Sequence, residues 1–269
     1  MIRLLAHLFL QEYRFQYRSW WHAALFVMTC VITLTIYWFT SEAIHSLTKL
    51  DERWAATSYF EFLLLGELIL LFPLAACDAT VRAVRFAASE GLLEDFFLHP
   101  GGPLKPLWTL SLSLLLPNLV YLMVTPILAS AMFGYSLEWP RALGIAGLIL
   151  TSLPLFMGVG WIAAGVFLRF GRGQGVLSQV LYASSVLAGA YFPLSAMPER
   201  LSQVVLLTSP FAALLQMCRE VAVGREIPFI PVILAFMGVG LLTLALGALA
   251  LNWASDTLRR GNWPQFLHP

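Results

Sequence analysis

Long uncharged apolar runs alternate with short polar segments along this chain of 269 residues. A helix that crosses a bilayer needs roughly 20 mostly apolar residues, and six segments meet this requirement. The six predicted spans are 20–40, 58–77, 107–133, 142–168, 175–193 and 229–252. Pro117, Pro126 and Pro154 fall inside the third and fourth spans, where neighbouring helices can satisfy the freed backbone groups. The pattern predicts an all-α membrane protein with a single transmembrane domain over 1–269, kinked at these prolines.

The composition supports a membrane protein and excludes other classes. Hydrophobic residues make up 59% of the chain and charged residues 12%, and the mean hydropathy is +0.78. A soluble domain usually carries about twice this share of charge. The net charge of +1 provides no basic surface for a nucleic acid. Cys30, Cys77 and Cys218 are too far apart for a metal site or a disulfide framework, so we interpret them as small apolar residues in or near spans.

The segment before the first span, residues 1–19, has polar side chains on one helical face. The polar positions recur every three or four residues: Arg3, His7, Gln11, Arg14 and Arg18. This pattern predicts a helix lying in the plane of the cytoplasmic interface, with a plain charged tail as the alternative. The segment lacks a small-residue cleavage site, so we expect the first span itself to direct insertion.

The distribution of cations predicts the orientation, because cytoplasmic loops carry an excess of Lys and Arg. One set of loops holds ten: Arg3, Arg14, Arg18, Arg82, Arg85, Lys105, Arg169, Arg172, Arg259 and Arg260. The opposite set holds six: Lys49, Arg53, Arg141, Arg200, Arg219 and Arg225. Ten against six predicts that both termini are cytoplasmic.

Two loops differ from simple connections. The outer loop over 194–228 contains two apolar stretches, each too short to span, which Pro198 and Pro210 open as first-turn prolines do. Such short apolar helices are typical of re-entrant or interfacial segments.

The inner segment over 85–100 predicts a short amphipathic helix, in which Leu93, Phe96, Phe97 and Pro100 form an apolar ridge beside Glu90 and Glu94. A ridge of exposed aromatic residues favours a protein partner; packing on the chain's own bundle is the alternative.

The inner segment resembles a motif of the ABC-2 type permeases, the membrane subunits of many bacterial ABC exporters. Their pattern between spans two and three reads E-G-T-L-E-x-L-L-x-T-P. The matching positions are Glu90, Gly91, Leu93, Glu94 and Pro100, with Phe96 and Phe97 at the two leucine positions. Leu92 and His99 replace the two threonines. The resemblance implies that this stretch is a coupling helix, which docks into a cleft of a separate nucleotide-binding subunit.

A second stretch resembles the same family in the outer loop. The family pattern reads G-x-F-F-P-L-x-x-L-P-x-W, followed by N-P. The positions that carry the likeness are Gly189, Tyr191, Phe192, Pro193, Leu194, Met197, Pro198 and Pro210. Arg200 stands at the tryptophan position and Ser209 at the asparagine position. The resemblance implies two re-entrant helices near the outer exit of a path between two protomers, with spans two and five facing that path.

ATP chemistry is expected on a partner. A Walker A loop needs Gly-Lys followed by Ser or Thr, and Lys49 and Lys105, the two lysines of the chain, do not follow glycine. We therefore expect no enzyme activity, no catalytic residue, no metal ligand and no cofactor in this chain. The resemblance implies Mg-ATP on a separate ATPase subunit and a homodimer, or a heterodimer with a paralogue, in contact with membrane lipids.

Glu67 lies near the middle of the second predicted span. An ionisable residue there usually faces a partner or an aqueous cavity, so it is either a substrate or proton contact or a structural hydrogen-bond acceptor. Tyr182 and Tyr191 lie in the fifth predicted span and either line a path or pack at the interface.

These features together predict the permease subunit of an ATP-driven exporter in the bacterial inner membrane. The expected substrate is lipid-like, hydrophobic drug-like or lipid-linked, because the outer loops leave no room for an extracellular domain. The alternatives are a glycan or haem-type export permease of the same superfamily, and a secondary transporter. A secondary transporter would show an internal repeat and paired intramembrane charges. No convincing repeat relates 20–133 to 142–252.

Overall fold

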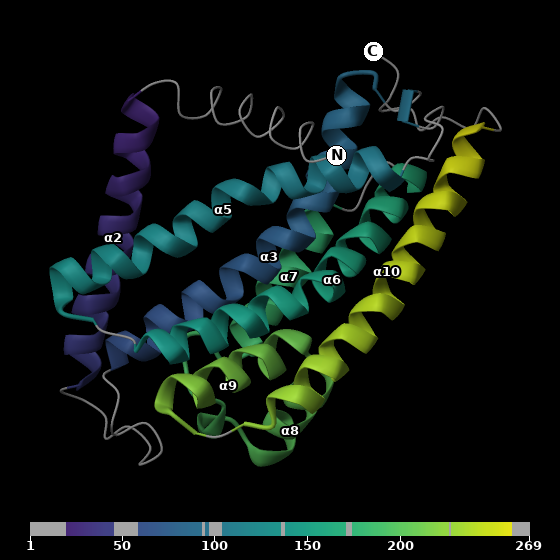
Figure 1. Cartoon of the computed structure of the whole chain (residues 1–269). Helices are drawn as coiled ribbons and strands as arrows, with labels where there is room; N and C mark the ends of the chain where they lie inside the picture. The colour runs from purple at the N-terminus through teal and green to yellow at the C-terminus, as the bar shows by residue number, and fades with distance from the viewer. Residues whose placement is uncertain are drawn as a thin grey trace.

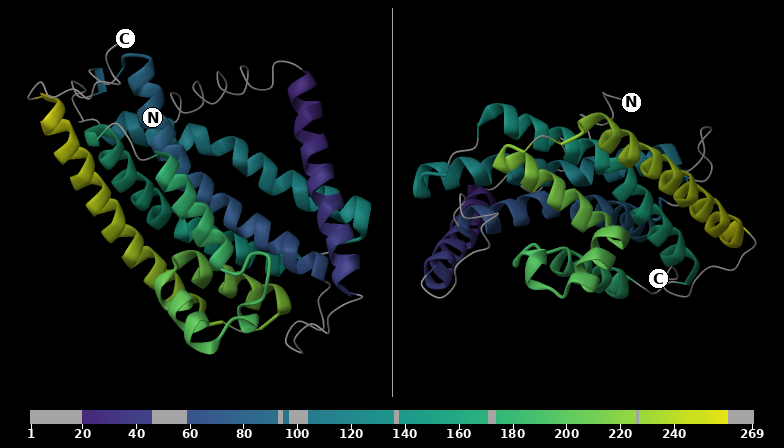
Figure 2. Two further views of the ribbon diagram at one scale, coloured as in Figure 1. Left: turned by 180° about the vertical axis from the view of Figure 1, so that it is seen from behind. Right: turned by 90° about the horizontal axis from the view of Figure 1, so that it is seen from below.

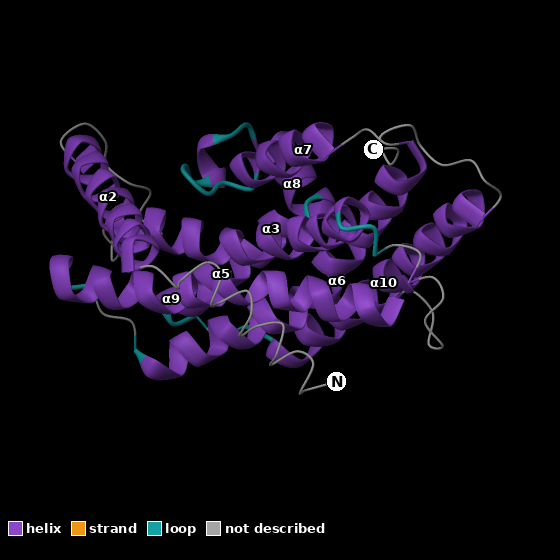
Figure 3. Cartoon of the chain, turned by 90° about the horizontal axis from the view of Figure 1, so that it is seen from above, coloured by secondary structure: helices purple, strands orange, loops and turns teal. Residues whose placement is uncertain are grey.

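A computed structural model gives the arrangement of the chain. It describes residues 20–45, 59–92, 95–96, 104–135, 138–170, 174–225 and 227–259. Every regular element of this part is a helix (Figure 3). The elements are α2 (Trp20–His45), α3 (Tyr59–Ser89), α5 (Leu104–Phe133), α6 (Trp139–Phe170), α7 (Gln174–Leu187), the 3-10 helix η2 (Leu194–Ala196), α8 (Glu199–Thr208), α9 (Pro210–Val223) and α10 (Phe229–Arg259). The prediction of an all-helical membrane protein is confirmed.

Five of these helices are long and apolar enough to cross a membrane, namely α2, α3, α5, α6 and α10. A sixth crossing is present if α8 and α9, which bend by 100° at Ser209, count as one broken span. The fifth predicted span, over 175–193, instead contains the 14-residue helix α7 followed by irregular backbone. The chain is therefore a multi-pass membrane protein with five to six spans.

Helices α2, α3, α5 and α6 run alternately down and up, and α10 runs parallel to α6 (Figure 1). The first turn of α2 and the last turns of α3 and α10 lie at one end of the bundle, and α8 and α9 lie at the other end. We call these the upper and the lower end, as they are drawn in Figure 1. The segment from η2 to α9 is called the hairpin. Its helices lie beside the first turns of α3 and α10.

Helix α3 is the centre of the bundle. Of its most apolar window, 78% is buried inside the protein, against 11% for both α2 and α10. Its neighbours include α5, α6, α7 and α9. Helix α2 stands apart and meets the ends of α3 and α5 (Figure 2). The outer helices therefore present apolar side chains to lipid, whereas α3 is mostly covered by protein.

Glycines allow α6 and α10 to pack at close range. A Cβ on Gly158 of α6 would lie 2.5 Å from the backbone of Thr243 and Leu244 in α10, and one on Gly247 of α10 would lie 2.7 Å from Cβ of Trp161 in α6. Small residues that let two backbones approach are the usual basis of helix association in lipid. This contact fixes α10 on the bundle although most of its surface is exposed.

Buried hydroxyl groups within the spans are satisfied locally. Ser111 Oγ donates to Leu107 O at 2.7 Å, Ser152 Oγ donates to Ile149 O at 2.7 Å, and Thr80 Oγ1 donates to Cys77 O at 2.7 Å. A bilayer provides no water for such groups, so a bond to the preceding turn of the same helix removes the cost of burying them. Cys30, Cys77 and Cys218 are free and buried, which fits their interpretation as small apolar residues.

The end of the second predicted span differs in the structure. Helix α3 continues for three turns beyond the predicted end of span two and ends at Ser89, so residues 85–89 belong to it. Within the outer loop, Pro198 is the N-cap of α8 and Pro210 is the first residue of α9. Gly224 ends α9 in the left-handed conformation, with a φ of 83°, which glycine adopts without steric cost. The predicted in-plane helix over 1–19 lies outside the described residues.

Candidate functional site

Helix α3 exposes one narrow stripe, and that stripe carries charge. The exposed or partly exposed positions between Glu67 and Ala87 recur mostly every three or four residues and share a face: Glu67, Leu71, Leu74, Asp78, Arg82, Arg85 and Phe86. Nearly all other positions from Phe62 to Ala87 are buried. Four of the five charged residues of α3 lie on the stripe, and the fifth, Glu61, does not. The stripe extends over roughly 27 Å at 1.5 Å per residue.

Helices α2 and α10 show a different pattern, because most of their exposed positions are apolar. Examples are Ile32 and Ile36 in α2 and Leu241 and Leu242 in α10. Side chains of this kind suit contact with lipid tails, whereas charged side chains do not. The exposed face of α3 is thus chemically distinct from the faces that meet lipid.

Asp78 and Arg82 form an ion pair within the stripe. The Arg82 Nε atom lies 2.8 Å from Asp78 Oδ2, one helical turn away, and the side chains are 41% and 42% exposed. Ion pairs of this spacing and exposure contribute only a few tenths of a kcal/mol, roughly 0.3–0.5. The pair therefore contributes little to stability. It leaves a polar group without net charge on the exposed face of α3.

Glu67 lies among tyrosine side chains from three parts of the chain. The Tyr191 hydroxyl, in the loop after α7, donates to Glu67 Oε2 at 3.4 Å. The Tyr37 hydroxyl of α2 lies close enough to interact with Glu67 and Tyr191, and Tyr121 of α5 is close enough to interact electrostatically with Glu67. A tyrosine hydroxyl is protonated at neutral pH, so Tyr191 is a donor to this carboxyl group. We call these four residues the Glu67 cluster.

Arg219 of α9 is the most deeply buried charged residue described, with 2% of its surface exposed. Its guanidinium donates to three carbonyl oxygens: Gly189 O at 2.8 Å, Ala190 O at 3.0 Å and Phe62 O at 3.2 Å. Its Cζ atom also lies 3.6 Å from the centre of the Phe62 ring. Two of the carbonyls follow the C-terminus of α7, where the helix dipole favours a cation. Carbonyl dipoles and a ring face thus replace the carboxylate partner that a buried arginine usually has.

The same loop is held to α3 by two further contacts. The Tyr59 hydroxyl donates to Tyr191 O at 2.7 Å. Gly66 allows the loop to approach closely, because a Cβ there would collide with Ala190 O and come within 3.0 Å of the Arg219 guanidinium. The backbone of residues 189–191 is therefore fixed from both α3 and α9, and Arg219 joins α3, the loop after α7 and the hairpin.

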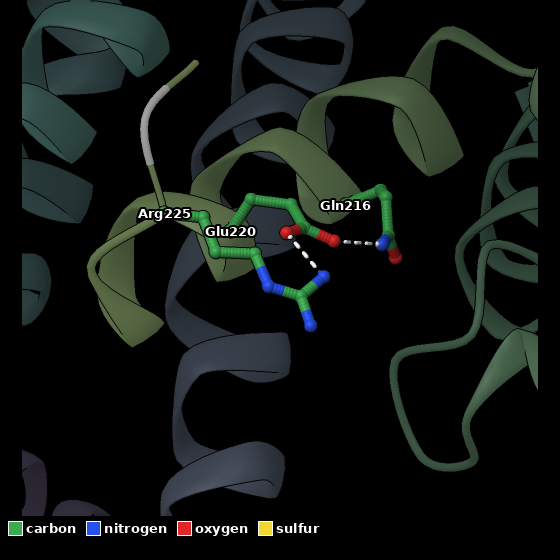
Figure 4. A network of polar contacts seen from close by, with 3 residues as sticks. All are labelled: Gln216, Glu220 and Arg225. Carbon is green, nitrogen blue, oxygen red and sulfur yellow. Dashed lines mark hydrogen bonds and ion pairs between the residues drawn. The ribbon is translucent and has the colours of Figure 1, made fainter. Parts of the chain in front are cut away.

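The last turn of α9 carries a smaller polar network (Figure 4). Gln216 Nε2 donates to Glu220 Oε1 at 2.8 Å, and Arg225 Nη1 donates to Glu220 Oε2 at 2.9 Å. Arg225 follows the helix end at Gly224, so it reaches back over the C-terminus of α9. The network closes the end of the helix, and we assign it a structural role.

The predicted coupling residues are only partly described. Glu90 and Gly91 form a turn directly after α3, with Gly91 at a φ of 69°. Phe96 is half buried and packs against a cluster that includes Val84 and Trp161, so this member of the predicted ridge contacts the chain's own bundle. Leu93, Glu94, Phe97 and Pro100 lie outside the described residues.

The predicted residues of the outer loop surround the start of the hairpin. Tyr191, Phe192 and Pro193 form the bend between α7 and η2, and Pro198 and Pro210 begin α8 and α9. Tyr182 is 59% exposed on α7 and interacts electrostatically with Tyr191. The structure therefore brings Glu67 and Tyr191 into contact, with Tyr182 next to them.

The sequence pattern did not identify two features, the charged stripe and Arg219. The spacing of Glu67, Asp78, Arg82 and Arg85 was a visible signal for the stripe. Arg219 was counted among the outer-loop cations, whereas the structure buries it in α9. Among the described residues, no group of three or more His, Cys, Asp or Glu is arranged to hold a metal ion.

A search of protein-family models gives no match to the chain, and a search of curated proteins gives none either.

Proposed function

We propose that the chain is the membrane-spanning subunit of an ABC exporter, with Mg-ATP bound and hydrolysed on a separate subunit. The observation that carries the proposal is the single charged stripe on the otherwise buried helix α3. A helix in the middle of a bundle has no structural need for an exposed charged face. A path for a polar group needs such a face. The stripe therefore supports a transport function over a purely structural one.

The position of the E-G-x-L-E motif supports ATP-driven transport specifically. Glu90 and Gly91 follow α3 without a break, since Glu90 N donates to Phe86 O at 3.0 Å and Leu92 N donates to Ala87 O at 2.8 Å. A force on the segment after α3 acts directly on the helix that carries the stripe. A change driven by nucleotide binding can shift α3 only if the docked subunit contacts the two states of this helix differently. The continuous backbone between the turn at Glu90 and α3 would transmit such a change.

The proposed assembly contains two membrane subunits, two copies of this chain or this chain and a paralogue, with an ATPase on each. The bacterial inner membrane, with both termini in the cytoplasm, is the proposed location, and the lower end of Figure 1 is then the outer side. The hairpin at that end is the proposed re-entrant gate. The proposed substrate is lipid-like, hydrophobic drug-like or lipid-linked; a glycan or haem-type cargo is the alternative within the same superfamily.

A secondary transporter is the second candidate, and Glu67 is the observation that favours it. A carboxylate within a span, in contact with tyrosine hydroxyls, is typical of sites that bind protons or ions. That alternative requires no partner protein, so the presence or absence of an ATPase decides between the two.

The test is mild purification from the native host, followed by mass spectrometry of the bound proteins. We expect a stoichiometric soluble subunit with a Walker A loop. The variant Phe97→Ala, in the coupling motif, should lose this subunit while remaining in the membrane. Glu138→Ala, which removes an exposed carboxylate at the opposite end of the bundle, serves as the matched control and should keep it. If the wild-type chain purifies alone even after cross-linking, the exporter proposal is wrong.

A further inference from the structure

The surroundings of Glu67 point to the kind of molecule that this site binds. The inference rests on the proposed transport function, and it concerns the substrate class. We propose that the Glu67 cluster is a binding site for a hydrophobic organic cation.

The first support is that Glu67 contacts donors but no cation. In the part of the chain that the structure describes, its partners are the hydroxyls of Tyr37 and Tyr191, with Tyr121 nearby. The described ion pairs join Arg82 to Asp78, Arg141 to Glu138 and Arg225 to Glu220, and Glu67 takes part in none of them.

The second support is that Arg219, the most deeply buried charged residue described, already binds groups other than Glu67. Arg219 faces Phe62 and Gly66 of α3, and its guanidinium is held by three carbonyls. It is therefore not positioned to neutralise the Glu67 carboxylate.

The third support is the depth and openness of the site. Glu67 lies eight residues after Tyr59, the start of α3, or roughly 12 Å along the helix axis. It belongs to the exposed stripe, and the side chains of Leu71 and Leu74 follow it on the same face. Tyr182 and Tyr191 are also open to the surroundings. A ligand at this depth has apolar contacts for its hydrophobic body and one carboxylate for its charge.

The chemistry of these groups selects a cation. The ring face of tyrosine attracts a positive charge, and a carboxylate attracts it more strongly where water is excluded. The hydroxyls of Tyr37 and Tyr191 hold the Glu67 side chain in place without supplying a positive charge. An anion of the same size and hydrophobicity would be repelled, so charge rather than size should decide binding.

The probes are tetraphenylphosphonium and tetraphenylborate, which are nearly identical in shape and opposite in charge. Equilibrium binding is measured on the full chain in nanodiscs of a zwitterionic phospholipid. We expect saturable binding of the phosphonium, a loss of at least tenfold in affinity in Glu67→Gln, and no loss for the borate. Glu138→Gln, an exposed carboxylate outside the stripe, is the matched control and should bind as the wild type does.

A second measurement leaves Glu67 intact, in case Glu67→Gln does not fold. The variant Leu71→Cys places a thiol one turn along the stripe, and the three native cysteines are buried. Phosphonium should slow maleimide labelling of this cysteine, and borate should not. Equal labelling with both ions, or equal phosphonium affinity in Glu67→Gln and the wild type, would overturn the site.

These outcomes separate the site from the proposed function. If phosphonium binding depends on Glu67 and no ATPase is bound to the purified chain, the site stands and the exporter proposal fails. If the ATPase is bound and phosphonium affinity does not depend on Glu67, the exporter proposal stands and the cation site is wrong.

Discussion

Replacing Arg219 by methionine tests whether this side chain holds the hairpin to α3. Methionine fills a similar volume but donates no hydrogen bond, so the carbonyls of Gly189 and Ala190 lose their donor inside the protein. Each buried acceptor left without a partner costs about 1–3 kcal/mol. The guanidinium no longer has to be buried, which offsets part of this loss. We therefore expect a net loss of about 2–4 kcal/mol in the free energy that keeps the hairpin closed.

Cys218 provides a direct assay, because it precedes Arg219 and is buried. In a background in which Cys30 and Cys77 are serine, maleimide labelling of Cys218 reports opening of the hairpin. A loss of about 2–4 kcal/mol corresponds to labelling that is roughly 30- to 700-fold faster, since every 1.4 kcal/mol is tenfold. The rate is measured in detergent micelles under conditions in which the protein stays folded.

The control is Arg225→Ala, directly after the hairpin. The Arg225 side chain is half exposed and its ion pair with Glu220 lies at the surface, so its removal should cost no more than about 1 kcal/mol. Arg219→Lys keeps the charge but cannot reach three carbonyls with one planar group, and it should fall between methionine and the wild type. Equal labelling rates in Arg219→Met and Arg225→Ala would refute the assignment of Arg219 as the contact that closes the hairpin.

Three further predictions follow from close contacts and from the proposed coupling. Gly66→Ala places a Cβ against Ala190 O and should destabilise the protein by about 1–3 kcal/mol; thermal unfolding measures this, and unchanged stability would contradict the close approach. Gly147→Ala, where no atom lies within 4 Å, is its control and should be neutral or stabilising, by up to about 1 kcal/mol. Glu94→Ala should lower substrate-stimulated ATP hydrolysis without reducing the amount of protein in the membrane; normal stimulation would remove the coupling-helix assignment. Tyr191→Phe removes one donor to Glu67 and should weaken phosphonium binding less than Glu67→Gln does, as measured by the same equilibrium binding.

Helix α3 connects the proposed sites to one another. It is a single helix of 31 residues, which begins at the Tyr59 contact with the outer loop and ends at the turn of Glu90 and Gly91. Arg219 binds the Phe62 carbonyl near its start. A tilt of α3 driven from the inner end would therefore move the hairpin with it, unless the Arg219 contacts break. The labelling rate of Cys218 in the presence and absence of nucleotide distinguishes these two cases.

Several features of the fold could be predicted from the sequence because they depend on local composition. The apolar runs predicted all five of the long helices. A span needs about 20 apolar residues, and a helix satisfies the backbone hydrogen bonds of such a segment within the bilayer. Pro210 at the first position of α9 and Gly224 after its end are local signals for the limits of a helix. The same rules failed for α7, because residues 188–193 are apolar but do not continue the helix.

The extent of α3 shows a limit of hydropathy. The predicted span ended at Cys77, before the charged residues, whereas the helix continues through Asp78, Arg82 and Arg85 to Ser89. Hydropathy alone does not report where a helix ends. The charged turns are stable because their other faces are buried, as Val81, Val84 and Ala87 are, against α5, α6 and α10.

The sequence by itself determined a multi-pass helical membrane protein, the order of its helices and the two motifs that resemble an exporter permease. Only the tertiary structure decided which faces are covered. Arg219 reaches carbonyls that lie 29, 30 and 157 residues away in the sequence, and the tyrosines around Glu67 come from α2, α5 and the loop after α7. Whether a charged side chain is buried, paired or open depends on such distant segments. The physical reason is that the cost of placing a charge is set by the dipoles and hydrogen-bond partners around it, and these are brought together only when the helices pack.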